Sequence, residues 1–336
     1  MSEENKEEKS GLMKGCLIVA ALGSVLMILF VGFAVFIFSV ILGKSFNVFH
    51  EMQRQENYNV NEIIYKNGKE EVEIAVIDVQ DVIMSGESTD FIKRALRKAL
   101  NTETVKGVVI NLNTPGGEVT ATDEIYYEIQ KLQNAGKPVV ACMHAVAASG
   151  GYYIAAGTKY IVANKSTITG SIGVIMSTVN AKKLLDKVGL ESVVIKSGKH
   201  KDSLNPAKPL SDEDLAHFQK LIDATYMDFA EVVSKGRNID IAEFKKKDGP
   251  YSNARIMKAT EALDLKLIDQ IGYFDDALAK VITLANADGA TVKLYKRPGG
   301  FAGIFDIKAT GKEVLKESLP VNFAIKPGRM YYLLMN

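Results

Sequence analysis

The sequence predicts a largely parallel α/β fold that is preceded by one membrane-spanning helix. Three observations support this prediction. From Val72 onward, short apolar runs typical of strands alternate with segments whose apolar residues recur at helical spacing. The 336 residues are enough to bury a full hydrophobic core. Near the N-terminus, the segment Cys16–Gly43 contains no charged residue.

The charge-free segment Cys16–Gly43 is long enough to cross a bilayer. As a helix it would span about 42 Å at roughly 1.5 Å per residue, whereas the hydrocarbon core is about 30 Å thick. A cleaved signal peptide would be shorter and would end in an Ala-x-Ala-like site, so we expect an uncleaved signal anchor. Basic residues flank it on both sides: Lys6, Lys9 and Lys14 precede it, and Lys44 and Arg54 follow it. Their distribution favours a cytoplasmic N-terminus by a small margin.

Shifts in composition divide the chain into five parts. The Lys/Glu-rich N-terminus is too polar to pack a core, and the stretch after the anchor is polar with scattered apolar positions. The expected parts are a disordered cytoplasmic N-terminus (1–15), a transmembrane signal anchor (16–43), a stalk or linker (44–70), the folded α/β domain (71–290) and a C-terminal extension (291–336).

Hydrophobic periodicity predicts the elements of the folded domain. Strands are expected at Val72–Val79, Val108–Leu112, Pro138–Cys142, Tyr160–Ala163, Gly173–Met176 and Glu191–Ile195. Helices are expected at Thr89–Leu100, at Thr120–Gln133, directly after Ser149, at Ala181–Val188, from Ser211 to about Lys235, at Asn253–Ala262 and at Asp275–Ala285. Ser211 precedes three acidic residues, which predicts that it caps the longest helix.

Composition argues against several classes of function. Lys and Arg number 41 and Asp and Glu number 40, so the net charge is near zero and a nucleic-acid partner is not expected. Cys16 begins the apolar anchor and Cys142 lies in an expected strand, so we expect no disulfide between them. No Cys/His cluster has the spacing of zinc ligands. We therefore expect neither a metal nor another cofactor.

Three stretches of the folded domain carry residues suited to hydrolysis. Ser149 lies among small residues at the expected start of a helix and supplies a nucleophile. Lys201 supplies a base, provided that burial away from carboxylates favours a neutral amine. The turn Gly116-Gly117 follows an apolar strand, and its main chain can approach a substrate carbonyl and donate to an oxyanion.

Each of these residues also has a structural explanation. Taken alone, Ser149 fits a helix N-cap beside a Gly-Gly turn, and Lys201 fits a surface position in a lysine-rich loop. Lys199 is the nearest alternative base, because it lies only two positions away. A Ser-His-Asp hydrolase with His200 as the base also stays open.

Four motifs, taken together and in order, carry a family resemblance. They are Asn113–Gly117, Ala147–Tyr153, Thr169–Val174 and Lys196–Asp202. From about Val72 to Ala285 the chain resembles the short, single-domain form of bacterial signal peptide peptidase A, a membrane-anchored Ser-Lys serine protease. The resemblance implies a ClpP/crotonase-like fold with a repeated ββα core, and it makes residues 71–290 the peptidase domain.

The resemblance also implies roles for individual residues. It makes Ser149 the nucleophile and Lys201 the base, and it makes Ser171 a hydroxyl that orients the lysine amine. It further implies that the N–H groups of Gly117 and Gly150 bind the oxyanion. Members of this family form rings, so the lysine base can come from a neighbouring subunit and need not meet Ser149 within one chain.

The expected function is that of a membrane-anchored serine endopeptidase that degrades remnant signal peptides and other hydrophobic peptides. Its expected partners are peptide substrates, the membrane and further copies in a ring-shaped homo-oligomer, and its catalytic domain is expected outside the cytoplasm. A crotonase-like acyl-CoA enzyme and a non-catalytic membrane scaffold with a protease fold stay open as alternatives. The apolar tail Met330–Met335 resembles the peptides that such an enzyme would cut. Two explanations of this tail stay open: it packs against the protein's own core, or it enters an active site and is trimmed there.

Overall fold

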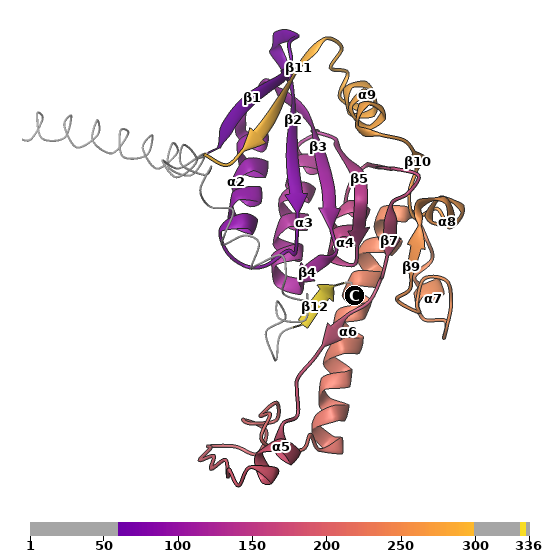
Figure 1. Ribbon diagram of the computed structural model, residues 1–336. Helices are drawn as coiled ribbons and strands as arrows, with labels where there is room; N and C mark the ends of the chain where they lie inside the picture. The colour runs from indigo at the N-terminus through magenta and orange to yellow at the C-terminus, as the bar shows by residue number, and fades with distance from the viewer. Residues whose placement is uncertain (1–59, 299–329, 334–336) are drawn as a thin grey trace, which may run out of the picture. The chain divides into compact units, whose positions relative to one another are not determined.

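The computed structural model describes residues 60–298 and 330–333 (Figure 1). The strands of these residues are β1 (Asn61–Lys66), β2 (Lys69–Gln80), β3 (Val105–Thr114), β4 (Gly116–Glu118), β5 (Val139–Ala148), β6 (Tyr160–Ala163), β7 (Ile168–Gly170), β8 (Ile175–Met176), β9 (Ile256–Lys258), β10 (Gln270–Ile271), β11 (Ala290–Lys296) and β12 (Met330–Leu333). Their helices are α2 (Glu87–Asn101), α3 (Val119–Asn134), α4 (Gly150–Ala156), α5 (Lys182–Lys187), α6 (Asp212–Arg237), α7 (Ile241–Phe244), α8 (Ala259–Asp264) and α9 (Phe274–Ala285).

The main sheet has the strand order β1-β11-β2-β3-β5-β6-β10. Its central strands, from β11 to β6, run parallel, and β1 closes one edge antiparallel to β11. Strand β7 pairs with the last residues of β5, and β9 pairs antiparallel with β7. A second sheet of three short strands has the order β4-β12-β8. The mixed α/β architecture with a parallel centre agrees with the prediction from alternating strands and helices.

Helices cover both faces of the main sheet, so its central strands are buried on both sides. Figure 1 shows α2, α3 and α4 on one face and α9 on the other. Ala75 and Ile77 of β2 join the core under α2 and α3, whereas Ile74 and Val76 join the core under α9. This division follows from the period of two in a strand. It also explains why these strands read as continuous apolar runs in the sequence.

Helix α6 connects the sheet to a segment that lies away from it. The helix starts where the sequence predicted, because the side chain of Ser211 accepts a hydrogen bond from the N–H of Asp214. Towards its other end, Phe229 and Val233 are buried in the core that also contains α4. Figure 1 shows that the first turns of α6 extend past the sheet and end beside α5 and the loops around it.

The main sheet includes residues that the sequence analysis assigned to flanking parts. Strand β1 lies inside the expected stalk 44–70, and β11 continues to Lys296, inside the expected extension 291–336. The two strands pair with each other across more than 200 positions of sequence. All residues of β1 are exposed, so this edge strand lacks the apolar pattern by which a strand is recognised.

Two predictions of local structure were wrong. Glu191–Ile195 pairs with no strand among the described residues, and the side chains of Val193 and Ile195 are 80% and 98% exposed. The expected helix Asn253–Ala262 is divided into β9 and α8. The division arises because β9 pairs with β7, which is a long-range contact that overrides local helical spacing.

The expected anchor Cys16–Gly43 lies outside the described residues, as does Cys16 itself. Within residues 60–298 and 330–333, the helices are too short or too polar to cross a membrane. Cys142 is buried in β5 with its thiol unpaired.

Candidate active site

Ser149 forms the sharp turn between β5 and α4. Its backbone has φ 52° and ψ −114°, in a region that residues other than glycine rarely occupy. Its N–H donates to the carbonyl oxygen of Gly170 (2.8 Å), and its own carbonyl accepts from the N–H of Tyr153 (2.8 Å). Strand β7 and the first turn of α4 therefore hold the strained turn in place. Strain of this kind is concentrated at functional sites.

The hydroxyl of Ser149 is buried and has no hydrogen-bond partner among the described residues. Ser149 occupies the N-cap position of α4, yet its side chain makes no capping hydrogen bond. Capping therefore does not explain this serine. Leaving a buried hydroxyl unpaired costs about 1–3 kcal/mol, and such groups are retained where a ligand or reactant later provides the partner.

The Gly116-Gly117 turn is held by the segment that follows β2. The N–H of Ile83 donates to the carbonyl of Gly116 (2.8 Å), and the N–H of Glu118 donates to the carbonyl of Ile83 (2.7 Å). Since successive main-chain groups of a strand point to opposite sides, the N–H of Gly117 faces away from Ile83. A Cβ on Gly117 would lie 1.9 Å from the Ile83 oxygen, and a Cβ on Gly150 would lie 3.1 Å from Gly117 N. Both positions therefore exclude a side chain, and the two glycines lie next to each other.

Strand β12 lies in the groove between β4 and β8. Tyr332 pairs with Gly117 on one side, and Tyr331 pairs with Ile175 on the other. A Cβ added to Gly116 would be 2.0 Å from the Tyr332 carbonyl oxygen and 2.6 Å from Gly150 N. The carbonyl oxygen of Tyr332 therefore lies beside Gly116 and Gly150 and next to the Ser149 turn, and Tyr332 itself pairs with Gly117. An oxyanion would form at this position during attack by the serine.

The side chain of Tyr332 fills an aromatic pocket. Its ring centroid lies 5.1 Å from that of Tyr153 and 4.7 Å from that of Phe229. Its hydroxyl donates to the carbonyl of Thr225 (3.3 Å). Burial raises the pKa of Tyr332, so the phenol stays protonated and remains a donor. The main chain of β12 is thus held between two strand edges, and the Tyr332 ring is held in an apolar pocket.

Ser171 lies directly beside the Ser149 turn. It follows Gly170, whose carbonyl binds the Ser149 N–H, and its own N–H donates to the carbonyl of Arg255 (2.8 Å). Ser171 is buried, with 8% of its surface exposed. The fold therefore brings together four of the residues that the sequence singled out: Gly117, Ser149, Gly150 and Ser171.

Lys201 does not lie near these four residues in the same chain. It is exposed and lies in a loop against the first turn of α6, where His200 Nδ1 is 2.8 Å from Asp214 Oδ1. Helix α4, which begins after Ser149, contacts Phe229 in the other half of α6. The rise from Asp214 to Phe229 is about 22 Å at 1.5 Å per residue. One chain therefore separates the serine from the lysine by a distance on the order of 20 Å.

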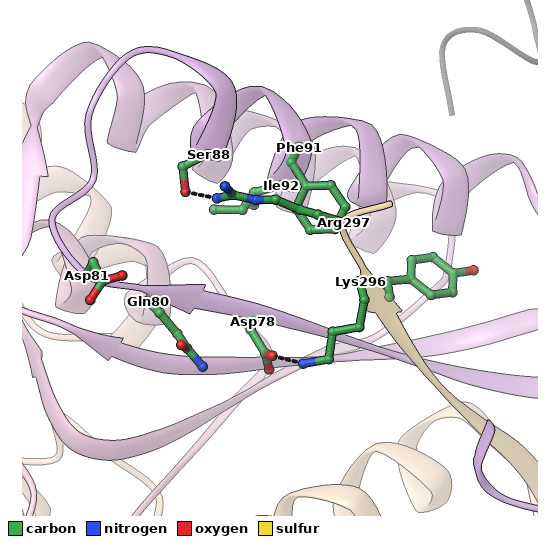
Figure 2. A pocket seen from close by; sticks show the side chains of 9 residues that line it. Asp78, Gln80, Asp81, Ser88, Phe91, Ile92, Lys296 and Arg297 are labelled. Atoms are coloured by element: carbon green, nitrogen blue, oxygen red, sulfur yellow. Dashed lines mark hydrogen bonds and ion pairs between the residues drawn. The ribbon is translucent and has the colours of Figure 1, made fainter. Parts of the chain in front are cut away.

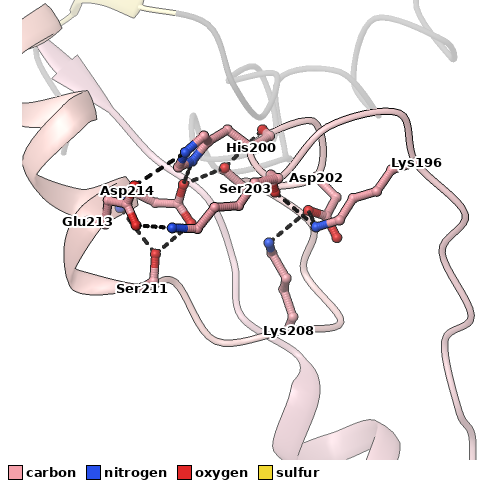
Figure 3. A network of polar contacts seen from close by, with 9 residues as sticks. Lys196, His200, Asp202, Ser203, Lys208, Ser211, Glu213 and Asp214 are labelled. Carbon is pink, nitrogen blue, oxygen red and sulfur yellow. Dashed lines mark hydrogen bonds and ion pairs between the residues drawn. The ribbon is translucent and has the colours of Figure 1, made fainter.

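The loop that carries Lys201 is held by a polar network (Figure 3). The carboxylate of Asp214 accepts hydrogen bonds from the hydroxyls of Ser203 (2.6 Å) and Ser211 (2.7 Å), and it contacts the ring of His200. These hydrogen bonds lower the pKa of Asp214, and the bond from Ser203 has the largest effect. His200 thus contacts a carboxylate at the far end of α6, and the alternative of His200 as the base for Ser149 finds no support within one chain.

Ion pairs hold the residues on both sides of Lys201. Asp202 lies between the amines of Lys196 (2.5 Å) and Lys208 (2.8 Å), whose hydrogen bonds lower its pKa to about 2. Lys199 forms an ion pair with Glu213. In the part of the chain that the structure describes, the amine of Lys201 has no such partner. Of the two candidate bases, Lys199 is therefore engaged and Lys201 is free to contact another molecule.

A cavity of about 300 Å³ opens at the ends of β2 and β11 (Figure 2). Figure 2 shows the amine of Lys296 against the carboxylate of Asp78, with which it forms an ion pair. The cavity also contains Asp81, whose carbonyl accepts a 2.5 Å hydrogen bond from the hydroxyl of Thr114. Thr114 lies at the end of β3, two residues before Gly116. The cavity therefore lies beside Asp81, which binds the residue at the end of β3, just before the glycine turn.

The groove and its aromatic pocket were not predicted from the sequence. Phe229 lies inside a helix that was correctly expected, but nothing in its local pattern marks it as part of a pocket. The apolar tail was the one available signal, because it suggested a peptide that could enter the site. Among residues 60–298 and 330–333, no group of His, Cys, Asp and Glu residues is arranged to hold a metal ion.

Two family models match the chain. Residues 131–288 match the model described as Peptidase family S49, and residues 63–169 match the model described as Clp protease. The two matches overlap across the Ser149 turn. The Clp protease match covers the parallel strands β2, β3, β5 and β6 and the glycine turn, and it agrees with the fold expected from the motifs.

Relatives with similar sequences come from several kinds of organism. A candidate signal peptide peptidase SppA of Enterococcus faecium is 34% identical over 299 residues, which are 82% of this chain and 86% of that protein. Protease 4 of Haemophilus influenzae is 34% identical over 242 residues, which are 69% of this chain and 36% of that protein. The chloroplastic serine protease SPPA of Arabidopsis thaliana is 32% identical over 192 residues, which are 57% of this chain and 28% of that protein.

Proposed function

We propose that this chain, which belongs to peptidase family S49, is a serine endopeptidase whose nucleophile is Ser149 and whose base is Lys201 of a second copy. Family membership accounts for peptide hydrolysis. The proposal adds the residues that carry out the reaction, the way in which a substrate binds and the kind of peptide that is cut.

The observation that carries the proposal is the strand β12 in the groove between β4 and β8. An extended peptide that adds a strand to a sheet edge satisfies its main-chain hydrogen bonds, and its side chains then enter pockets that give specificity. Tyr332 pairs with Gly117, and its carbonyl oxygen lies beside Gly150. A substrate bound in the same way would present its scissile carbonyl to Ser149.

The geometry supports the following reaction. The hydroxyl oxygen of Ser149 attacks the carbonyl carbon while the neutral amine of Lys201 takes the hydroxyl proton. The N–H groups of Gly117 and Gly150 stabilise the negative oxygen, and one such donor contributes about 2.7–4 kcal/mol. The lysine gives its proton to the leaving amine, and an acyl group remains on the serine. Water then attacks the acyl carbon while the amine takes a proton from it. The bond between the acyl carbon and the Ser149 oxygen breaks, the lysine returns the proton to that oxygen, and the new acid leaves as a carboxylate.

A second copy of the chain is the proposed source of the lysine. Lys201 is exposed, has no side-chain partner among the described residues and is on the order of 20 Å from Ser149. The segment that leads to it also exposes large apolar side chains: Val179, Leu184, Val188, Leu190, Val193, Val194 and Ile195. Several exposed apolar side chains in one segment are typical of an interface. A ring in which each copy covers this segment of its neighbour would bury the apolar surface and complete each site.

Hydrophobic peptides near a membrane are the proposed substrates. The pocket around Tyr332 is aromatic, and the flanking strand edges pair with the main chain. Anchoring by the charge-free segment Cys16–Gly43 would hold the domain, outside the cytoplasm, beside the bilayer where remnant signal peptides lie. A crotonase-like acyl-CoA enzyme would need neither the anchor nor a groove between two strand edges.

Labelling with a serine-directed fluorophosphonate tests this proposal. The full-length wild-type protein in detergent should be labelled on Ser149, and Ser149→Ala should abolish labelling and peptide hydrolysis. Ser166→Ala, which changes an exposed serine outside the groove, is the control and should behave as wild type. A wild-type protein that is folded but neither labelled nor active on hydrophobic peptides would favour the acyl-CoA enzyme or the non-catalytic scaffold.

A further inference from the structure

Thr122 carries a buried hydroxyl that nothing in the reaction described so far uses. It lies in the first turn of α3, five residues after Gly117. The residue is fully buried, and its Oγ1 has no hydrogen-bond partner among the described residues. A helical threonine commonly donates to a carbonyl of the preceding turn, and this one does not.

The other buried threonines of the described residues all satisfy their hydroxyls. Each of them donates to a main-chain carbonyl: Thr89, Thr114, Thr158, Thr167, Thr169, Thr225 and Thr291. Thr122 is therefore the exception among buried threonines in this part of the chain. Since an unpaired buried hydroxyl is unfavourable, its retention calls for a partner that arrives with the substrate.

The position of Thr122 indicates what that partner is. A Cβ added to Gly150 would lie 2.8 Å from Thr122 Oγ1, 3.1 Å from Gly117 N and 3.1 Å from the Tyr332 carbonyl oxygen. The hydroxyl, the Gly117 nitrogen and the carbonyl oxygen therefore surround one point above Gly150. Ser149, whose buried hydroxyl also has no partner among the described residues, directly precedes Gly150 in the chain.

We propose that the Thr122 hydroxyl is a third donor to the oxyanion and that it engages in the transition state. This inference rests on the proposed function of Ser149. The hydroxyl makes no hydrogen bond to the trigonal carbonyl of Tyr332 in the occupied groove. Attack by the serine converts that carbon to a tetrahedral centre and moves its oxygen, which carries the new negative charge. A donor that meets the oxygen only after this movement stabilises the transition state more than the bound substrate, which is the condition for a gain in rate.

The test compares Thr122→Val with Thr122→Ser. Valine keeps the shape of threonine and removes the hydroxyl, whereas serine keeps the hydroxyl. Thr122→Val should lower kcat for a hydrophobic peptide by about 10²-fold and leave KM nearly unchanged. The second-order rate constant of fluorophosphonate labelling should fall with it, because the phosphonyl adduct is tetrahedral and places an oxygen in the same site. Thr122→Ser should retain both rates within a few-fold.

Thermal unfolding separates this role from a structural one. Because Thr122→Val removes an unpaired buried hydroxyl, its Tm should rise, by about 2–4 °C for each kcal/mol gained. Thr158→Val is the matched control: its hydroxyl is buried but donates to Ala155 O (2.7 Å), so Tm should fall and labelling should stay at the wild-type rate.

Wild-type rates in Thr122→Val would overturn the inference, and so would a lower Tm together with slow labelling in Thr122→Ser. A wild-type protein that is not labelled at all would instead overturn the proposed function itself.

Discussion

The serine half and the lysine half of the proposed site are built in different ways. Ser149 and its glycines lie where strands of two sheets and three helices meet, and the residues around them are almost completely buried. Lys201 lies in an exposed loop that is held by hydrogen bonds and ion pairs to the first turn of α6. The hydrophobic core completes the serine half within one chain, whereas the lysine half has no core behind it.

The positions of the residues in the two halves are therefore determined by different interactions. Burial of apolar surface is cooperative and positions main-chain atoms within narrow limits, as an oxyanion site requires. Surface ion pairs are individually weak, with a median of about 0–1 kcal/mol, so a loop held by them stays adaptable. Adaptability suits a residue that must meet a separate subunit, and it predicts that substitutions in the two halves have different consequences.

The largest expected effect is the loss of activity in Ser149→Ala and Lys201→Ala, each by at least about 10⁴-fold. Mixed in detergent and allowed to exchange subunits, the two inactive variants should regain part of the activity, because some sites then join an intact serine to an intact lysine from another copy. Lys199→Ala, two positions away, is the control and should keep near-wild-type turnover. A mixture that stays inactive after proven exchange would show that both residues must belong to the same chain.

The pH profile should report the same base. Since only the neutral amine accepts the serine proton, kcat/KM of the wild-type protein should rise from neutral to alkaline pH. A profile that is flat over two units above neutrality would contradict a lysine base, and a profile that follows a histidine would favour His200.

A single added methyl group should separate the two halves. In Gly150→Ala, the new Cβ would lie 2.8 Å from Thr122 Oγ1 and 3.1 Å from Gly117 N, so it should block the oxyanion position and lower kcat by about 10²–10³-fold. Gly198→Ala places the same methyl group in open space in the lysine loop and should have little effect. If both variants lost kcat equally while their Tm stayed at the wild-type value, the distinction between the halves would be contradicted.

Loosening the lysine loop should have a smaller effect. Asp214→Asn removes the charge that holds His200, Ser203 and Ser211, and it should lower kcat by about tenfold to 10²-fold through misplacement of the neighbouring lysine. Asp212→Asn changes an exposed carboxylate of the same helix turn and is the control. An unchanged kcat in Asp214→Asn would show that the network does not position the base.

Acid should open the lysine half before the serine half. Hydrogen bonds from Lys196 and Lys208 lower the pKa of Asp202 to about 2, below the value of about 3.9 in an unfolded chain. The stabilisation from this carboxylate is therefore complete above about pH 4 and is lost as the pH falls towards 2. Hydrogen exchange in residues 196–208, measured relative to α3 at each pH, should increase over that interval. A constant ratio would contradict this dependence.

The smallest expected effect concerns the tail. Because β12 places the Tyr332 carbonyl beside Gly116 and Gly150, the wild-type protein should slowly trim its own C-terminus after Tyr332. Intact-mass spectrometry after long incubation should find a shortened wild-type chain and a full-length Ser149→Ala chain. Identical full-length masses in both would show that the tail occupies the groove without being cut.

Local patterns were sufficient for much of the fold. The parallel strands, the start of α6 at Ser211 and the turn at Ser149 follow from apolar periodicity, capping and small-residue motifs, which act over a few residues. The roles assigned to Ser149, Lys201, Ser171, Gly117 and Gly150 stay predictions. The edge pairing of β1 with β11 was not predicted, because an exposed polar strand has no local apolar pattern.

The residues suited to chemistry and their local settings follow from the sequence alone. Short stretches are enough to predict a serine on a strand-to-helix turn, a glycine turn after a strand and a lysine in a polar loop. Which of these residues lie close together depends on the tertiary structure. Parallel strands bring Ser149, Gly117 and Gly170 together because their ends share one edge of the sheet, and α6 separates Lys201 from them by its length. Proximity across a fold depends on long-range packing, which no short stretch of sequence encodes.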